Sequence, residues 1–315
     1  MTTNQKDLLP QKQPYFYSFD QYLKERFHEK IYKISLNGGM TCPNRDGTLD
    51  NRGCIFCSEG GSGDFASSSK LSIAQQIEEG KKLLSKKTDC RHFIAYFQAF
   101  TNTYAPYDHL EKIFTEAISS EEIVALSIGT RPDCIPDDVL ELLKKLNQQK
   151  PVMIELGLQT IHEQTAIFIR RGYPLSTFSD CVRRLSDAKL EIVVHLILGL
   201  PGETKEMMLD TIRYVNTLPV NGVKLSMLHV LKNTDLARIY ENEPFFTFDL
   251  DSYTDLILLC IKQLRKDIVI HRLTGDGPKD LLIAPKFSLN KRLVLNTIHQ
   301  KCKRYQIYQG ADLNT

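Results

Sequence analysis

The sequence contains no apolar run long enough to cross a membrane, and its polar beginning, MTTNQKDLLPQKQPYF, has no apolar signal core. It also lacks repeats, low-complexity tracts and a strong charge bias, since 40 Lys and Arg stand against 38 Asp and Glu. The net charge of +2 argues neither for nor against RNA, because a local patch is enough to bind it. The 315 residues are enough for a substantial core in one large domain or two ordinary ones. We expect a soluble, cytoplasmic protein with no membrane partner.

A disulfide framework is absent as well, because the eight cysteines show no regular pairing, which favours a reducing compartment. Three of them, Cys42, Cys54 and Cys57, lie in the polar, Gly-rich segment 39–64, GMTCPNRDGTLDNRGCIFCSEGGSGD. This segment follows the alternating apolar run 31–36, so we expect a long loop that leaves a strand. Three thiols on one loop suit a metal site, because thiolates are soft ligands for zinc and for iron–sulfur clusters.

The number of ligands separates the candidate metals. A structural zinc ion normally takes four protein ligands, whereas this loop supplies three and a second Cys-x-x-Cys pair is absent from the chain. Zinc would therefore need a distant fourth ligand, such as Cys90 or His92, and scattered core cysteines are a further alternative. We favour a [4Fe-4S] cluster, in which three thiolates leave one iron free to bind a small molecule.

The loop resembles the cluster loop of the radical S-adenosylmethionine (SAM) superfamily. The common spacing there is Cys-x3-Cys-x2-Cys, whereas eleven residues separate Cys42 from Cys54 here. The long form, with CPNRDGT after the first cysteine and GCIFC around the others, is similar to a bacterial long-loop branch near the elongator catalytic subunit and the oxygen-independent coproporphyrinogen oxidases. The resemblance implies that Cys42, Cys54 and Cys57 hold a [4Fe-4S] cluster and that SAM chelates its fourth iron.

The remaining chain alternates between strand and helix patterns. Six candidate strands, at 31–36, 92–100, 122–128, 151–158, 191–200 and 222–230, are separated by amphipathic segments. This succession indicates α/β structure with a parallel sheet, either doubly wound or an incomplete barrel. The resemblance implies the second, a partial (β/α)6 TIM-like barrel over 30–240, after an N-terminal extension (1–29). A small C-terminal α+β extension (241–315) would complete the chain.

The resemblance also implies SAM contacts at the strand ends. ELGLQT followed by RRGY is similar to elongator-type enzymes, in which Gln159 would bind the SAM ribose and Arg171 its carboxylate. GTRPDC is similar to their ETRPD pattern, so Arg131 carries over, but Gly129 replaces the glutamate. HLILGLPGET would receive the adenine, with His195 either near the ribose or in the core. A solvated pair at a helix end is the alternative for the two arginines of RRGY.

Two groups of basic residues suggest an anionic substrate. Lys24, Arg26, His28, Lys30 and Lys33 make the approach to the loop basic, and seven Lys and Arg with interleaved aromatic residues occupy 279–308, which suits RNA as well as a solvated helix face. His229 and Lys232 are further candidate substrate contacts.

The resemblance implies a 5′-deoxyadenosyl radical, an electron donor such as flavodoxin or ferredoxin, and tRNA as partner. The expected reaction is at the wobble uridine, from 5-carboxymethylaminomethyluridine to 5-aminomethyluridine. A radical SAM oxidoreductase acting on a small molecule and a non-catalytic metal-binding module are the alternatives.

Overall fold

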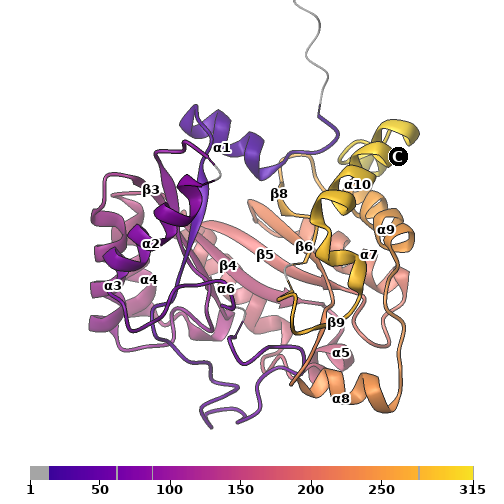
Figure 1. Ribbon diagram of the computed structural model, residues 1–315, viewed down its shortest axis with the longest axis horizontal. Coiled ribbons are helices and arrows are strands. Elements are labelled where there is room, and N and C mark those ends of the chain that lie inside the picture. The colour runs from indigo at the N-terminus through magenta and orange to yellow at the C-terminus, as the bar shows by residue number, and fades with distance from the viewer. Residues whose placement is uncertain (1–13, 62, 87, 276, 315) are drawn as a thin grey trace, which may run out of the picture.

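Seven parallel strands form one sheet that curls into a half-barrel (Figure 1). The computed structural model describes residues 14–61, 63–86, 88–275 and 277–314. The strands follow the order β1-β2-β3-β4-β5-β6-β8, and each pairs in parallel with its neighbour. Their bounds are β1 Tyr32–Leu36, β2 Phe93–Phe97, β3 Ile123–Thr130, β4 Val152–Gln159, β5 Glu191–Leu198, β6 Gly222–Met227 and β8 Val269–Arg272.

The prediction of a partial parallel barrel is thus confirmed, and the structure adds one strand to the six expected. That strand, β8, comes from the segment assigned to the C-terminal extension and pairs with β6. The extension therefore contributes to the barrel itself. A separate two-stranded antiparallel sheet joins β7 (Val230–Leu231) to β9 (Leu282–Ala284).

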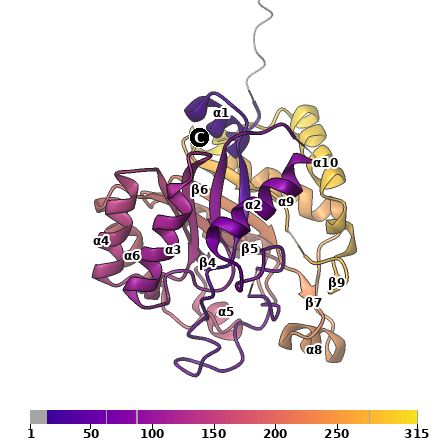
Figure 2. The same cartoon turned by 60° about the vertical axis from the view of Figure 1, so that its left-hand side comes forward.

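Helices cover the outside of the half-barrel (Figure 2). They are α2 Ile73–Ser85, α3 Tyr107–Ser119, α4 Asp137–Asn147, α6 Leu175–Asp187, α7 Lys205–Asn216, α9 Leu250–Gln263 and α10 Lys291–Tyr305, with short 3-10 turns at Pro132–Cys134, Lys286–Leu289 and Ala311–Asn314. Two further helices, α5 Glu163–Phe168 and α8 Asp235–Asn242, lie at the end of the barrel where the cysteine loop lies. In the described part of the chain, no helix combines the length and the apolar character that a membrane span requires.

Strand β4 shows how the sequence divides the two faces of the sheet. Val152, Ile154, Leu156 and Leu158 belong to the main core, which the outer helices complete. The alternate positions face the barrel interior, because successive side chains of a strand point to opposite faces. Met153 packs at the barrel bottom, whereas Glu155, Gly157 and Gln159 line a pocket.

Helix α1 (Phe19–Phe27) lies at the opposite end of the barrel from the cysteine loop (Figure 1). Leu23 packs there with Ile94 and Met153 and closes the barrel bottom. The ring of Phe19 stacks on His271 of β8 with centroids 4.0 Å apart. Its ring also lies 5.0 Å from Nζ of Lys33 on β1, so α1 spans the two edges of the sheet.

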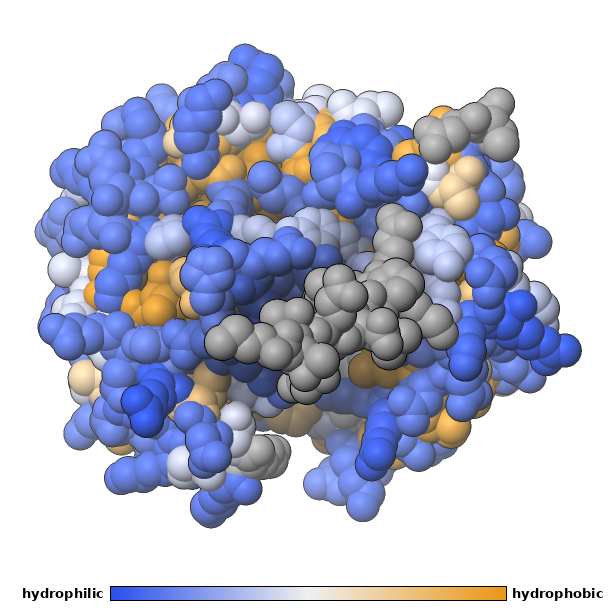
Figure 3. Space-filling view, turned by 90° about the horizontal axis from the view of Figure 1, so that it is seen from above, coloured by the Kyte–Doolittle hydropathy of each residue, from blue (hydrophilic) through white to orange (hydrophobic). Residues whose placement is uncertain are grey.

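The basic residues of α1 therefore do not lie beside the cysteine loop. Lys24 pairs with Asp20, and Arg26 pairs with Glu191. These are surface ion pairs, and the face of the molecule around α1 is largely hydrophilic (Figure 3). Of the predicted basic approach, Lys33 alone bonds to side chains inside the barrel among the described contacts.

Helix α10 distributes the C-terminal basic run over a long surface. A helix of 15 residues is about 22 Å long. Lys291 and Arg292 stand in its first turn, whereas Lys303 and Arg304 stand in its last. Lys301 is paired with Asp251 and Asp255 of α9. The run is consequently not one compact patch.

Candidate active site

A pocket of about 290 Å³ opens at the carboxyl ends of the strands, where the cysteine loop folds over the barrel. Residues 42–61 and 64 of the loop supply one side of it, and residues at and after the ends of β2 to β6 and of β8 supply the rest. In parallel barrels the strand ends carry the chemistry, because loops of different origin meet there. This pocket is the candidate active site.

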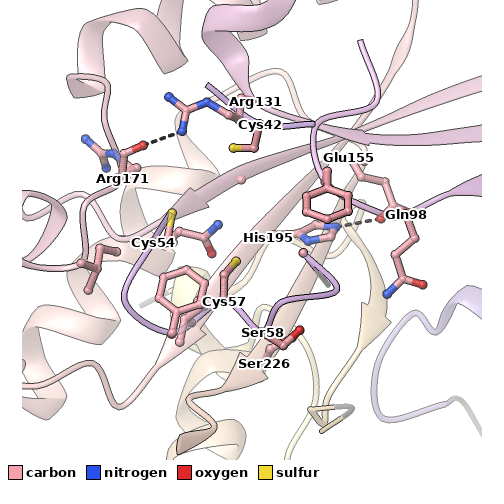
Figure 4. Close-up of a pocket in the computed structure, with 18 of the residues that line it drawn as sticks. Cys42, Cys54, Cys57, Ser58, Gln98, Arg131, Glu155, Arg171, His195 and Ser226 are labelled. Carbon is pink, nitrogen blue, oxygen red and sulfur yellow. Dashed lines mark hydrogen bonds and ion pairs between the residues drawn. The ribbon is translucent and has the colours of Figure 1, made fainter. Parts of the chain in front are cut away.

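The three predicted cysteine ligands line this pocket, and their sulfur atoms face a shared space (Figure 4). Among the described residues no three Cys, His, Asp or Glu side chains converge closely enough for a single metal ion. Three thiolates on one loop are the protein ligands that a [4Fe-4S] cluster takes when its fourth iron is left to a small molecule.

The proposed fourth zinc ligands lie elsewhere. Cys90 and His92 precede β2 and so stand at the amino ends of the strands. The Cys90 thiol donates to the carbonyl of Lys30, and His92 Nδ1 lies 2.6 Å from a carboxylate oxygen of Glu29. Neither residue lines the cysteine pocket, so the structure gives no support to zinc with a distant ligand.

The residues after Cys42 hold the loop in shape. Asn44 is buried and its Nδ2 donates to the carbonyl of Arg170 at 2.7 Å and to Cys54 Sγ at 3.3 Å. Arg45 donates to the carbonyl of Ser58 at 2.6 Å. The Asn and Arg of CPNRDGT thus explain how a loop with eleven intervening residues returns its second and third cysteines to the first.

Hydrogen bonding favours the thiolate form of Cys54 and raises the pKa of its donor, Cys57. The Cys57 thiol donates to Cys54 and, with Asn44 and the positive charges of Arg131 and Arg45, lowers the Cys54 pKa to about 7 against the effect of burial. Thiolates are the form that binds iron.

A buried carboxylate, Glu155 of β4, organises the floor of the pocket. Its side chain is fully buried and accepts from His195 Nε2 at 2.8 Å and from Ser127 Oγ at 2.8 Å (Figure 4). Lys33 and Lys224 form ion pairs with it from β1 and β6. Although burial opposes ionisation, the two ammonium groups and His195 keep the Glu155 pKa well below its usual range.

The side chains bonded to Glu155 and Glu155 itself come from five strands and form one polar layer. Tyr96 adds a sixth strand, β2, because Lys224 Nζ lies 3.2 Å from its hydroxyl. Burial raises the pKa of Tyr96, so the phenol stays protonated. Sequence reasoning missed Glu155, Ser127, Tyr96 and Lys224 as site residues. The available signal was a charged residue inside an otherwise apolar strand, at Glu155 in VMIELGLQ and Lys224 in GVKLSM, because such residues are seldom buried without partners.

The structure brings all four predicted SAM contacts to the pocket lining: Gln159, Arg171, His195 and Arg131. Gln159 ends β4 with a positive φ of 66° and lies beside Gly157. His195 is bonded to Glu155 in the floor, and burial followed by the charge of Lys224 lowers its pKa to about 4. It is therefore neutral at pH 7.

The two arginines are committed to neighbouring groups. Arg131 makes a forked pair with Asp133 at 2.9 and 2.7 Å and donates to the carbonyl of Arg171 at 2.9 Å. Arg171 is 2% exposed and donates to the carbonyls of Tyr173, Leu158 and Thr160, with Glu163 Oε2 at 3.4 Å. The expected contact of Arg171 with a SAM carboxylate would require some of these bonds to be exchanged.

Arg170 is not a solvated partner of Arg171. Its guanidinium pairs with Asp235 of α8 and donates to the carbonyl of Gly53 at 3.1 Å. The bond to Gly53 ties the segment after α5 to the cysteine loop. Of the two further candidates, His229 lines the pocket, whereas Lys232 is exposed and outside it.

The fold and the pocket define a parallel half-barrel protein whose mouth is closed by a three-cysteine loop. The chain belongs to the radical SAM superfamily: the family model described as Radical SAM superfamily matches residues 51–215, and that of the Radical_SAM C-terminal domain matches 220–304. It is a radical SAM enzyme, and its cofactors are a [4Fe-4S] cluster and SAM.

Relatives support the assignment. YtqA of Bacillus subtilis (strain 168) is 39% identical over 94% of this chain and 92% of its own length. The tRNA uridine(34) acetyltransferase of Methanocaldococcus jannaschii is 24% identical over 51% of this chain and 30% of its own. The solved archaeal Elp3 of Methanocaldococcus infernus shares the fold with a TM-score of 0.67 and 16% identity, over 89% of this chain and 64% of that one.

Proposed function

We propose that this enzyme modifies the wobble uridine of tRNA and converts 5-carboxymethylaminomethyluridine to 5-aminomethyluridine. The observation that carries the choice of RNA is a group of arginines beside the mouth of the pocket, next to the cysteine loop. The archaeal relative named tRNA uridine(34) acetyltransferase supports the same substrate class.

The arginine group surrounds Asp235. Arg170 and Arg238 both pair with this carboxylate, and together with Arg52 they lower its pKa, the hydrogen bond from Arg170 having the largest effect. Arg52 also pairs with Asp50, so the group contains three guanidinium groups and two carboxylates and has a net positive charge. Arg52 and Arg238 are highly exposed at 65% and 78% of their side chains. Exposed guanidinium groups suit the phosphates of a nucleic acid.

Apolar side chains are exposed at the same end of the barrel. Ile167 and Phe168 of α5 are 69% and 42% exposed, and Phe246 is 66% exposed. Helix α5 reaches the loop through the bond from the Ile55 amide to the Ile169 carbonyl at 3.3 Å. RNA loops present unstacked bases that pack on such side chains. The combination favours a single-stranded loop over a duplex.

We infer that Cys42, Cys54 and Cys57 hold the cluster. When bound, the cluster and SAM together supply a carbon-centred radical that removes a hydrogen atom from an unactivated carbon. The chain's own part is to position that carbon and exclude water and other quenchers. The loop covers one side of the pocket, and the polar layer around Glu155 closes its floor.

The net reaction on the uridine is an oxidation at the glycyl methylene. That carbon loses one hydrogen atom and then one electron to a one-electron acceptor, and its amine nitrogen loses a proton to give an imine. Water adds to the imine, and the carbon–nitrogen bond breaks to release glyoxylate and the 5-aminomethyl group.

Mass spectrometry of tRNA nucleosides tests the proposal, with a strain lacking this gene compared with its parent. We expect loss of the mature wobble uridine and accumulation of the carboxymethylaminomethyl precursor. The purified, cluster-loaded enzyme should then release glyoxylate from that tRNA. An unchanged nucleoside profile would refute the tRNA proposal and direct attention to a small-molecule substrate.

A further inference from the structure

A second layer of pocket residues lies above the polar layer around Glu155, on the side of the mouth. Gln98 stands two residues after Tyr96, directly behind the end of β2. Ser226 stands two residues after Lys224 on β6. Side chains two positions apart on a strand point to the same face, and both Gln98 and Ser226 line the pocket. Neither residue has a role in the proposed function so far.

This second layer is open in its middle. Its positions on β3 and β4 are Gly129 and Gly157, and neither glycine has a positive φ, so the backbone does not require glycine there. A Cβ on Gly129 would come no closer than 3.4 Å to an atom beyond its chain neighbours, so a methyl group would fit. Ile197 of β5 lines the pocket at the same level. We refer to the space over the two glycines as the slot, and its shape suits a flat ring.

His195 presents a hydrogen-bond acceptor to the slot from the layer below. Its Nε2 lies 2.8 Å from Glu155, a carboxylate that also pairs with two ammonium groups and therefore only accepts. Nε2 consequently carries the proton of the neutral ring, and Nδ1 is a bare acceptor. Nδ1 makes no hydrogen bond to any residue that the structure describes, and the side chain is 30% exposed and lines the pocket.

Gln98 and Ser226 supply donors beside this acceptor. The Ser35 hydroxyl donates to Gln98 Oε1 at 3.2 Å, and the amide nitrogen lies on the side of the pocket (Figure 4). The Ser226 hydroxyl makes no hydrogen bond within the described part of the chain. In Figure 4 the three cysteines lie on one side of His195 and Gln98 lies on the other. The slot therefore offers two donors and one acceptor.

We propose that Gln98, His195 and Ser226 bind the uracil ring of the substrate by its O2–N3–O4 edge. This inference rests on the proposed function, which makes a modified uridine the substrate. Uracil presents an acceptor, a donor and an acceptor along this edge. His195 Nδ1 accepts from N3–H, and Gln98 Nε2 and the Ser226 hydroxyl donate to the two carbonyl oxygens. Proteins read unstacked RNA bases by this edge.

Insertion by this edge also orients the reacting group. N1 and C5 flank C6, the ring atom opposite N3, so the ribose and the 5-substituent both leave the ring toward the mouth. The cysteine loop covers one side of the pocket there. Cytosine is excluded, because its N3 has no hydrogen for His195 and its amino group places a donor where uracil has O4.

Free nucleosides test the slot separately from tRNA and from the 5-substituent. 5-Methyluridine carries the complete edge, 3,5-dimethyluridine has a methyl group in place of the N3 hydrogen, and 5-methylcytidine has an amino group in place of O4. Binding is measured by ligand-observed NMR on the anaerobic holoenzyme saturated with SAM. We expect 5-methyluridine to bind at least tenfold more tightly than either analogue, a difference of about 1.4 kcal/mol.

Gln98→Leu and Ser226→Ala should each weaken 5-methyluridine binding about fivefold, as expected for the loss of one neutral hydrogen bond. His195→Asn keeps an N–H donor for Glu155 but withdraws the acceptor, so it should reduce the preference over 3,5-dimethyluridine to about twofold or less. Gln149→Leu, at an exposed glutamine before β4 and hence at the other end of the strands, is the matched control and should bind as the wild type does. Iron content and thermal unfolding of each variant establish that it is folded.

Three results would overturn the proposal. They are equal binding of the three nucleosides to the wild type, no binding of any of them at millimolar concentration, and unchanged 5-methyluridine affinity in folded Gln98→Leu. His195 is also a predicted SAM contact. If His195→Asn weakens SAM binding and leaves the nucleoside preference intact, the ring serves the cofactor and the proposal fails.

The remaining outcomes separate the slot from the proposed function. If the wild type fails to convert the modified tRNA but shows the Gln98-dependent binding of 5-methyluridine, the slot stands and the tRNA reaction fails. If it converts the tRNA but binds the three nucleosides equally, the reaction stands and the slot fails.

Discussion

Replacement of Glu155 by Gln should destabilise the protein strongly, because this carboxylate compensates two buried ammonium groups. The side chains of Glu155 and Lys224 are 0% and 5% exposed. Removing one partner of a buried ion pair typically costs about 3–5 kcal/mol, since the other charge is left without compensation. Among the described contacts, Lys224 would keep the Tyr96 hydroxyl at 3.2 Å as its hydrogen-bond partner.

This cost corresponds to a fall in melting temperature of roughly 6–20 °C, at about 2–4 °C per kcal/mol for a chain of this size class. Urea unfolding under anaerobic conditions, followed by circular dichroism, gives the change in free energy of unfolding. The control is a double-mutant cycle with Lys224→Met. In Glu155→Gln/Lys224→Met neither charge of the pair remains, so the double variant should be more stable than the sum of the single effects by about 2 kcal/mol.

Two results would refute this reasoning. One is a loss below 1 kcal/mol in Glu155→Gln, which would mean that water or another group replaces the carboxylate. The other is additivity of the two substitutions, which would mean that Glu155 and Lys224 do not interact in solution. The loss of the Glu155 charge should affect Lys33 less than Lys224, because the Lys33 side chain is 18% exposed and also bonds to Ser127.

Further substitutions test the loop, the strand ends and the rim. Cys54→Ala should abolish the iron–sulfur absorbance and all reductive cleavage of SAM, whereas Cys90→Ala, at the other end of the strands, should leave iron content unchanged; a normal cluster spectrum in Cys54→Ala would contradict the ligand assignment. Arg171→Lys should lower the free energy of unfolding by about 2–3 kcal/mol, because a lysine cannot reproduce the charged hydrogen bonds to three carbonyls. Unchanged stability together with weakened SAM binding would instead indicate that Arg171 contacts the cofactor directly. Burial and the charge of Lys224 lower the folded-state pKa of His195 to about 4, so between pH 6.5 and 4 the unfolded chain binds the proton first and stability falls as pH falls. His195→Asn should reduce this loss of stability between pH 7.5 and pH 5.5, measured by urea titration. An identical loss in the variant would exclude His195 as the source of the pH dependence. Arg238→Gln should lower the salt dependence of tRNA binding by about one unit of slope, and an unchanged slope would remove this side chain from the RNA surface.

The sequence by itself determined the class of fold and the chemistry of the mouth. Apolar runs such as FIAYF and VMIELGLQ, separated by amphipathic helices, can bury both faces only in a parallel sheet covered by helices. Three cysteines on a polar loop indicated a cluster, because the number of ligands and the softness of thiolates are local properties of the chain. The resemblance then selected the half-barrel from the alternatives that periodicity left open.

Tertiary structure alone decided which polar residues act together. Glu155, Lys224 and Lys33 lie on three strands far apart in sequence, and their pairing depends on the stagger of neighbouring strands, which periodicity does not define. The partners of Arg171 are backbone carbonyl groups of Tyr173 and of the end of β4, so its residue type could not reveal whether it faces a cofactor or the backbone. Strand β8 joined the barrel because it meets β6 in space, although the chain between them forms three other elements.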